Sequence, residues 1–234
     1  MTAEILSAAY AGDKKSIARI ISLIENQVDL HLRQPGHSVP VIGITGPPGA
    51  GKSTLVDALI GEYVNDGKSV AVLCVDPSSV VHQGAILGDR IRMSQWFNHE
   101  KVFIRSLSSR GSMGGLHPAI GKIKVFMQAC PFDVILIETV GVGQSEIEII
   151  KHADKTVLVL VPEAGDEIQL MKSGIVEVAD LFVVNKVDRP GSNIFVTQLS
   201  NMLKSKSSSK PVCSTIASKG DGVSELKKTI DALI

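Results

Sequence analysis

The chain has 234 residues, a length that fits one large domain or one domain with a small appendage. Its 24 Lys and Arg residues balance its 24 Asp and Glu residues, so no global charge favours nucleic acid or an anionic membrane as a partner. Hydrophobic residues make up 44% of the chain, and no apolar run reaches the ~20 residues that a transmembrane helix needs.

The N-terminal residues 3–25 carry apolar side chains at helical spacing, and Gly12 is expected to divide them into two helices. The polar stretch 27–38 contains Pro and Gly and is typical of a linker. We therefore expect an N-terminal helical extension and linker over residues 1–38, followed by the main domain over residues 39–234.

Beyond the linker, short β-rich runs alternate with helical segments. Seven strands are expected, at Val41–Thr45, Ser69–Val75, Val102–Arg105, Val134–Glu138, Thr156–Val161, Leu181–Asn185 and Pro211–Thr215. Several of these runs are continuously apolar, as strands buried on both faces of a parallel sheet are. The pattern predicts right-handed βαβ units and a three-layer α/β domain with a mostly parallel sheet.

The segment "GITGPPGAGKST" lies between the first expected strand and a helical run, Ser53–Val64. It satisfies the phosphate-loop pattern GxxxxGK followed by Ser or Thr, in the required strand–helix context. Glycines allow close backbone approach, and backbone N–H groups form a nest for phosphates. Lys52 supplies a charge between the β- and γ-phosphates, and Ser53 offers a hydroxyl to Mg²⁺. The nucleotide-binding residues expected here are Gly46, Pro48, Gly49, Ala50, Gly51, Lys52, Ser53 and Thr54.

Three acidic residues, Asp76, Asp89 and Glu138, fall at or just beyond expected strand ends. Ligands bind beyond the carboxyl ends of strands in open parallel sheets. One or two of these carboxylates, together with Ser53 and the nucleotide, would suffice for Mg²⁺, which prefers oxygen ligands. The glycine-containing segment 139–147 follows Glu138 and is expected to act as a switch that the γ-phosphate orders.

The segment "LFVVNKVDRPG" places Asn185, Lys186 and Asp188 at the end of the sixth expected strand. The Asp188 carboxylate can accept from guanine N1–H and the exocyclic amine, a donor pair that adenine lacks. Asn185 is expected to bond the base edge and the neighbouring loop, and the Lys186 stem is expected to cover the ring. Thr215, Ile216 and Ala217 follow the last strand, and the N–H groups of the latter two are candidate donors to the base oxygen.

Six segments carry a family resemblance: "GITGPPGAGKSTL", "VDPSSVVHQGAILGDRIRM", "FIRSLSSRGSMGGL", "ETVGVGQSE", "AGDEIQLMKSGIVEVADLFVVNKVD" and "SKGDGV". Together they resemble the MeaB/ArgK family of P-loop GTPases, which includes the human methylmalonic aciduria type A protein. The resemblance covers nearly all of residues 3–232. It implies a GTPase chaperone that gates adenosylcobalamin loading and protection of a cobalamin-dependent acyl-CoA mutase.

The resemblance also implies roles for individual residues. Ser53, Asp89 and Glu138 look like the Mg²⁺ shell, and Asp76 looks like the acidic residue near the metal and the attacking water. We accordingly expect Lys52, Asp76 and Glu138 to carry catalysis. The expected switch and signalling residues are Gly141, Gln144, which is a candidate for orienting water, and Lys172 in "EAGDEIQLMKSG".

The segment 80–115 is similar to the family's first switch, although residues 80–83 depart from its usual letters. Arg105 and Arg110, near the end of this segment, are alternative candidates for stabilising transition-state charge. Family members commonly continue into a C-terminal helical arm that forms the dimer. The sequence given ends at Ile234, so we expect no dimerisation through such an arm and leave the oligomeric state open.

Three other functions remain open at this point: a nickel-enzyme maturation GTPase, a small-molecule kinase and a regulator that binds GTP without turnover. The first needs Cys and His ligands, but the three cysteines form no CxxC pair and the histidines are scattered. The odd cysteine count argues against a disulfide framework, and the N-terminus lacks the order of a signal peptide. We therefore expect a cytoplasmic protein with no membrane or nucleic-acid partner.

Overall fold

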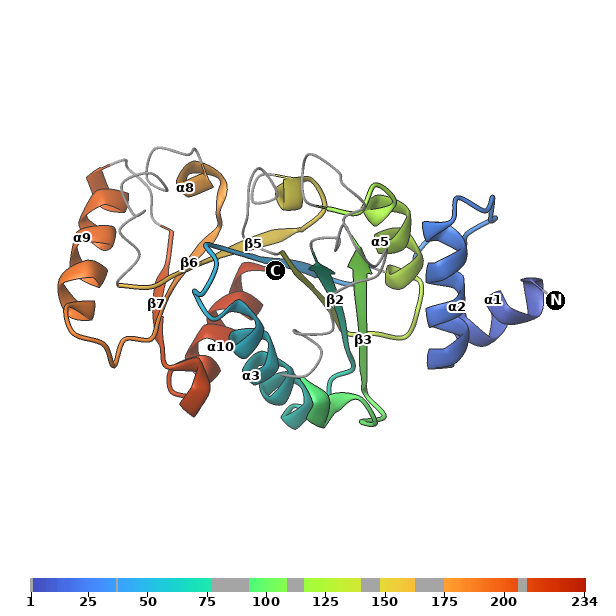
Figure 1. Cartoon of the computed structure of the whole chain (residues 1–234), viewed down its shortest axis with the longest axis horizontal. Helices are drawn as coiled ribbons and strands as arrows, with labels where there is room; N and C mark the ends of the chain where they lie inside the picture. Colours follow the sequence, from blue (N-terminus) through green and yellow to red (C-terminus); the bar gives the residue numbers. More distant parts are fainter. Residues whose placement is uncertain are drawn as a thin grey trace, which may run out of the picture.

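The computed structural model describes residues 2–36, 38–76, 93–108, 116–139, 148–162, 175–205 and 210–234. A seven-stranded sheet forms the centre of the molecule, in the order β3-β2-β4-β1-β5-β6-β7, and every pairing in it is parallel (Figure 1). The strands are β1 (Val41–Thr45), β2 (Val70–Asp76), β3 (Val102–Ser108), β4 (Val134–Glu138), β5 (Lys155–Leu160), β6 (Leu181–Asn185) and β7 (Val212–Thr215). The seven predicted strands are confirmed, and the largest shift extends β3 to Ser108.

Helices cover both faces of the sheet, which confirms the three-layer architecture. Helices α3 (Lys52–Asn65) and α10 (Val223–Leu233) pack on one face in a shared apolar cluster. Helix α5 (Ile120–Gln128) packs on the other face, where α8 (Ile175–Val178) and α9 (Ser192–Ser205) form a further cluster with β5 and β6. Among the described residues, no helix is long and apolar enough to cross a membrane.

The N-terminal extension consists of α1 (Thr2–Tyr10) and α2 (Lys14–Glu25), beside β3 and α5 in Figure 1. Gly12 separates the two helices with φ +96°, a conformation that favours glycine, and Asp13 caps α2 by accepting from the Ser16 N–H at 2.8 Å. The apolar face of α2 is buried in the same cluster as α5 and one face of β2 and β3. The expected break between two helices is therefore confirmed, and the extension shares the core of the main domain.

The strand register brings the predicted functional segments to one edge of the sheet. Glu138 pairs with Ile44 of β1 and with Cys74 of β2, so it lies beside the strand that leads into the phosphate loop. Asn185 pairs with Thr215 at the ends of β6 and β7. Strand β1 lies between β4 and β5, so the chain that follows it begins at the carboxyl end of the sheet, where ligands bind in open α/β sheets.

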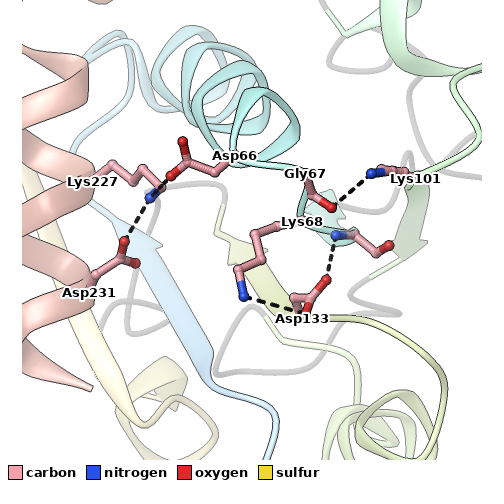
Figure 2. A network of polar contacts seen from close by, with 8 residues as sticks. Asp66, Gly67, Lys68, Lys101, Asp133, Lys227 and Asp231 are labelled. Carbon is pink, nitrogen blue, oxygen red and sulfur yellow. Dashed lines mark hydrogen bonds and ion pairs between the residues drawn. The ribbon is translucent and has the colours of Figure 1, made fainter.

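A polar network ties the elements together at the opposite, amino edge of the sheet (Figure 2). Asp133 accepts from the Ser69 N–H at 2.7 Å and forms an ion pair with Lys68. Lys227 of α10 forms ion pairs with Asp231 and with Asp66 at the end of α3. The Lys227–Asp66 pair attaches the C-terminal end of α3 to α10, at the end of the helix opposite to the predicted phosphate loop.

Other short helical turns are η1 (Ser94–Trp96), η2 (Ile149–Lys151) and η3 (Ala217–Lys219). The indole N–H of Trp96 donates to Asp57 on α3 at 2.8 Å, and its ring lies over Gly61. Trp96 lies within the predicted first switch, residues 80–115, and is thereby attached to the helix that follows the phosphate loop.

Candidate nucleotide-binding site

The phosphate loop connects β1 to α3, and three of its glycines, Gly46, Gly49 and Gly51, have positive φ angles that other residues cannot adopt cheaply. Gly46 has φ +143°, and a Cβ there would lie 2.1 Å from the Val159 carbonyl oxygen. Gly49 has φ +76°, and no atom of the described residues lies within 4 Å of where its Cβ would stand, so those residues leave the backbone accessible to a ligand. The loop is therefore shaped as the sequence pattern predicts.

Lys52 begins α3, and its side chain is buried within the loop. Its ammonium group donates to the carbonyl oxygens of Gly46 at 2.9 Å and Pro47 at 3.0 Å. These contacts hold the charge inside the curve of the loop. A bound polyphosphate would offer this ammonium stronger, charged acceptors in the same place.

Ser53 and Glu138 are brought together as predicted. The Ser53 hydroxyl donates to Glu138 Oε1 at 2.6 Å, and both residues are buried. Thr139, next to Glu138, donates from its hydroxyl to Thr45 Oγ1 at 3.0 Å, so the end of β4 is fixed against the start of the phosphate loop. A carboxylate and a hydroxyl oxygen buried beside a phosphate loop form a donor set that suits Mg²⁺.

The other predicted acidic residues are placed less completely. The backbone of Asp76 ends β2 and pairs with Ser108, on the same edge of the sheet as Glu138. Its side chain is not among the described ones. Asp89, Gly141, Gln144, Lys172 and Arg110 all lie outside the described residues.

Asn185 connects the base motif to the phosphate loop. Its amide Nδ2 donates to the Ala50 carbonyl oxygen at 2.9 Å, and its Oδ1 accepts from Thr215 Oγ1 and the Ala217 N–H, both at 3.1 Å. A Cβ on Gly51 would lie 2.4 Å from this amide, so glycine is required there for the contact. The two motifs, 135 residues apart in sequence, are thus in direct contact.

Lys186 and Asp188 complete the base motif. Lys186 has φ +61°, a left-handed conformation that is rare for a residue with a side chain, and its ammonium donates to the Gly49 carbonyl oxygen at 2.7 Å. Such strain is common at binding sites. The Asp188 carboxylate is about half exposed, as a group that must reach a ligand should be, and lies 3.8 Å from the Lys219 ammonium.

The loop after β7 has two contacts that the sequence prediction did not include. The Ile216 N–H donates to the Asp221 carbonyl oxygen at 3.0 Å, and the Ala217 N–H donates to Asn185, so both expected donors to the base oxygen are engaged within the protein. Lys219, which the sequence analysis did not single out, lies beside Asp188. Its position in the "ASKG" run after the last strand was the available signal.

Arg105 does not lie in this site. Its guanidinium donates to Ser22 and Glu25 of α2, which directs it toward the N-terminal extension. The structure thus gives no support to Arg105 as the residue that stabilises transition-state charge.

The fold and the site are those of a P-loop GTPase. The sheet is parallel throughout, and the phosphate loop holds a buried lysine. The loop serine bonds to an acidic strand end, and the guanine motif contacts the same loop. Residues 17–233 match the family model described as methylmalonyl-CoA mutase-associated GTPase MeaB. The chain therefore belongs to the MeaB family, and it hydrolyses GTP to GDP and phosphate.

Sequence relatives agree with this assignment. A protein of Pyrococcus horikoshii, named as a candidate GTPase, is 42% identical over 240 residues, which cover 97% of this chain and 76% of the relative. A fused isobutyryl-CoA mutase of Cupriavidus metallidurans is 39% identical over 197 residues, which cover 80% of this chain and 18% of that protein. The region similar to this chain is thus joined to a mutase in one polypeptide.

Solved structures show the same fold. The structure titled LAO/AO transport system kinase has a TM-score of 0.69 and 25% identity, and the match covers 99% of this chain and 74% of that one. The hydrogenase maturation factor HypB of Archaeoglobus fulgidus has a TM-score of 0.59 and 16% identity, with 94% of this chain and 98% of that one covered. At this identity the HypB likeness shows the fold alone, so it does not favour nickel maturation.

Proposed function

We propose that this protein is a GTP-hydrolysing chaperone that gates adenosylcobalamin loading of an acyl-CoA mutase and protects the loaded enzyme. The observation that carries the proposal is the relative in which the similar region is fused to isobutyryl-CoA mutase. The family description, a mutase-associated GTPase, supports the same partner. Covalent fusion holds two domains at high effective concentration, which is useful when the domains act on one another.

The hydrolysis reaction needs positioning and charge stabilisation more than covalent chemistry. Lys52 would exchange its carbonyl acceptors in the loop for oxygens of the β- and γ-phosphates. Ser53 and Glu138 fit Mg²⁺ and would hold it together with Asp89. The ion would supply positive charge against the phosphate oxygens. Asp76, at the end of the neighbouring strand, would hold the attacking water.

Guanine selectivity would come from the group around Asp188. Its exposed carboxylate can accept from the two donors on the guanine edge, and the side chains of Lys186, which reaches Gly49, and Lys219, which lies beside Asp188, would cover the ring. Asn185 would keep this group at a fixed distance from the phosphate loop. A rigid connection of this kind favours a ligand whose base and phosphates fit both sites together.

Signalling to the mutase would involve Gly141 and Gln144 after β4, and Lys172 before α8. The chain enters the first of these segments from Thr139, which is fixed to the end of β1. Contacts that the γ-phosphate makes there would be lost on hydrolysis, a common basis for GTPase switching. We expect slow hydrolysis until the mutase completes the site.

The gating proposal can be tested by following cofactor uptake. Apo-mutase is mixed with adenosylcobalamin and this protein in the presence of GTP, GDP or a non-hydrolysable GTP analogue, and loading is followed by the cofactor's absorbance. Gating predicts that the extent or rate of loading differs between GTP and its analogue. If loading were the same with GTP, with GDP, with the analogue and in the absence of this protein, the proposal would be contradicted.

A further inference from the structure

Glu25, the last residue of α2, is a buried carboxylate with 9% of its surface exposed. Its Oε2 accepts from the Arg105 guanidinium at 2.8 Å, and the same nitrogen, Nη2, lies 2.9 Å from the Ser22 hydroxyl oxygen. Its other oxygen, Oε1, lies 4.0 Å from His117 Nε2. One carboxylate of the N-terminal extension therefore faces both β3 and the chain that leads into α5.

The orientation of His117 is fixed by its other ring nitrogen. Nδ1 accepts from the Ala119 N–H at 3.0 Å, so the proton of the neutral ring lies on Nε2, the nitrogen that faces Glu25. His117 is almost completely buried. Glu25 thus has cationic or donor groups on two sides, from two different elements.

Stability alone does not require a charged pair at this position. Glu25, Arg105 and His117 each lie within two residues of a buried apolar side chain. Those side chains, Ile24, Leu107 and Leu116, all belong to the apolar cluster on this face of the sheet. Removing an ion pair from water costs free energy, and well-packed apolar residues of similar volume often serve as well or better. A fixed geometry is what a hydrogen-bonded pair supplies and an apolar contact does not.

Arg105 lies on β3, so a fixed Glu25–Arg105 pair would hold this strand in place relative to α2. Arg105 lies three residues before Ser108, or about 10 Å along a strand, and Ser108 pairs with Asp76 at the end of β2. In the part of the chain that the structure describes, strand β3 stands at the edge of the sheet and is paired with β2 alone. The Glu25–Arg105 pair lies between this edge strand and α2, which is beside it in Figure 1.

We propose that Glu25 is a positioning residue for GTP hydrolysis: through Arg105 it holds the carboxyl end of β3, and hence the backbone around Asp76, in the geometry that hydrolysis needs. The inference rests on the proposed role of Asp76. Under this proposal the N-terminal extension takes part in the reaction, although the described contacts of Glu25 do not include a nucleotide-binding residue. It requires no mutase, so it is tested on this protein alone.

The test is the double variant Glu25→Leu/Arg105→Met, which replaces the ion pair by apolar side chains and is expected to keep the thermal unfolding midpoint. Single-turnover hydrolysis of GTP should slow at least fivefold, with the Kd for GTP unchanged. Glu25→Gln, which keeps the shape and removes the charge, should give a loss in the same direction. Leu203→Ala, a cavity in the separate cluster of α9, is the control for destabilisation without loss of rate.

A folded double variant that hydrolyses GTP within twofold of the parent rate would overturn the inference. The inference would also be overturned if the double variant lost no more rate than Leu203→Ala, or if weaker GTP binding accounted for its loss of rate. Asp76→Asn is measured in parallel. A slow Asp76→Asn with a normal double variant refutes the role of Glu25 alone, and a normal Asp76→Asn refutes the role of Asp76 and with it the proposed route.

Discussion

The Ser53 hydroxyl and the Glu138 carboxylate share a 2.6 Å hydrogen bond between residues 85 positions apart in the chain. This bond joins the first turn of α3 to the end of β4 and buries both groups beside Lys52. Both oxygens suit Mg²⁺, so we expect metal and nucleotide binding to rearrange this contact rather than to build a site from separated parts.

Replacement of the carboxylate should therefore separate nucleotide binding from hydrolysis. In Glu138→Gln, we expect hydrolysis to fall about 10- to 100-fold or more, because the amide is a poorer metal ligand than the carboxylate. The Kd for GDP in EDTA should change little, since no guanine contact is altered. Glu225→Gln, on the exposed face of α10, is the matched control and should behave as the parent. Equal hydrolysis in the two variants would contradict the assignment.

Asp188→Asn should alter base selectivity. The amide cannot accept from both donors on the guanine edge, so we expect GTP affinity to fall roughly 10- to 100-fold, the loss of a charged hydrogen-bond acceptor. The same amide can donate to the second carbonyl of xanthine, so affinity for xanthosine triphosphate should rise. Competition binding with GTP, xanthosine triphosphate and ATP measures both effects. Asp29→Asn, an exposed site near the end of α2, should leave the ranking unchanged.

Asn185→Ala should destabilise the protein even without nucleotide. The side chain is buried and makes one donor and two acceptor contacts, so its removal leaves Ala50, Thr215 and Ala217 without those partners. We expect a loss of about 2–4 kcal/mol in the free energy of unfolding. Denaturant titration of the nucleotide-free protein measures it. Asn201→Ala, exposed on α9, provides the comparison, and a similar result for the two would show that Asn185 is not a structural link.

Much of this site follows from local sequence patterns. The phosphate loop and the NKxD motif each lie on a strand–turn segment whose period and glycines are visible in sequence, and parallel pairing brings strand ends together. The predictions for Gly46, Lys52, Ser53 and Glu138 therefore agree with the observed contacts. Their roles in catalysis remain predictions.

The remaining features depend on contacts that local patterns do not reveal. Arg105 was a candidate for transition-state charge, but its partner Glu25 lies 80 residues away on the extension. Ile216 and Ala217 carry N–H groups that suit a base oxygen, yet the turn that ends in Asp221 uses one and Asn185 uses the other. Such side-chain and turn choices are decided by tertiary packing, which periodicity does not encode.

Lys227 should contribute stability that depends on pH (Figure 2). Hydrogen bonds to Asp231 and then to Asp66 raise the pKa of its ammonium, so the folded state holds this proton more tightly than the unfolded state. The contribution is complete below the ordinary lysine pKa of 10.5 and is lost as pH rises through the raised value.

We therefore expect Lys227→Met to be less stable than the parent by about 1 kcal/mol at pH 8, because the two carboxylates are partly exposed. The difference should shrink above pH 10.5, the ordinary lysine pKa. Urea unfolding of both proteins across this range measures it. Lys68→Met, which removes a half-exposed lysine of the same region, should show a smaller difference. If the difference in stability between Lys227→Met and the parent grew as pH rose, it would contradict the ion pairs of Lys227 with Asp66 and Asp231.

The most direct test of the proposed function is the rate of GTP hydrolysis by the purified protein with and without an adenosylcobalamin-dependent acyl-CoA mutase, with ATP as the control nucleotide. We predict slow, GTP-selective hydrolysis by the protein alone and a clear increase when the mutase is added, which Lys172→Ala would reduce. Hydrolysis that is unchanged by the mutase, or as fast without it as that of a typical metabolic kinase, would contradict the proposal of a mutase chaperone.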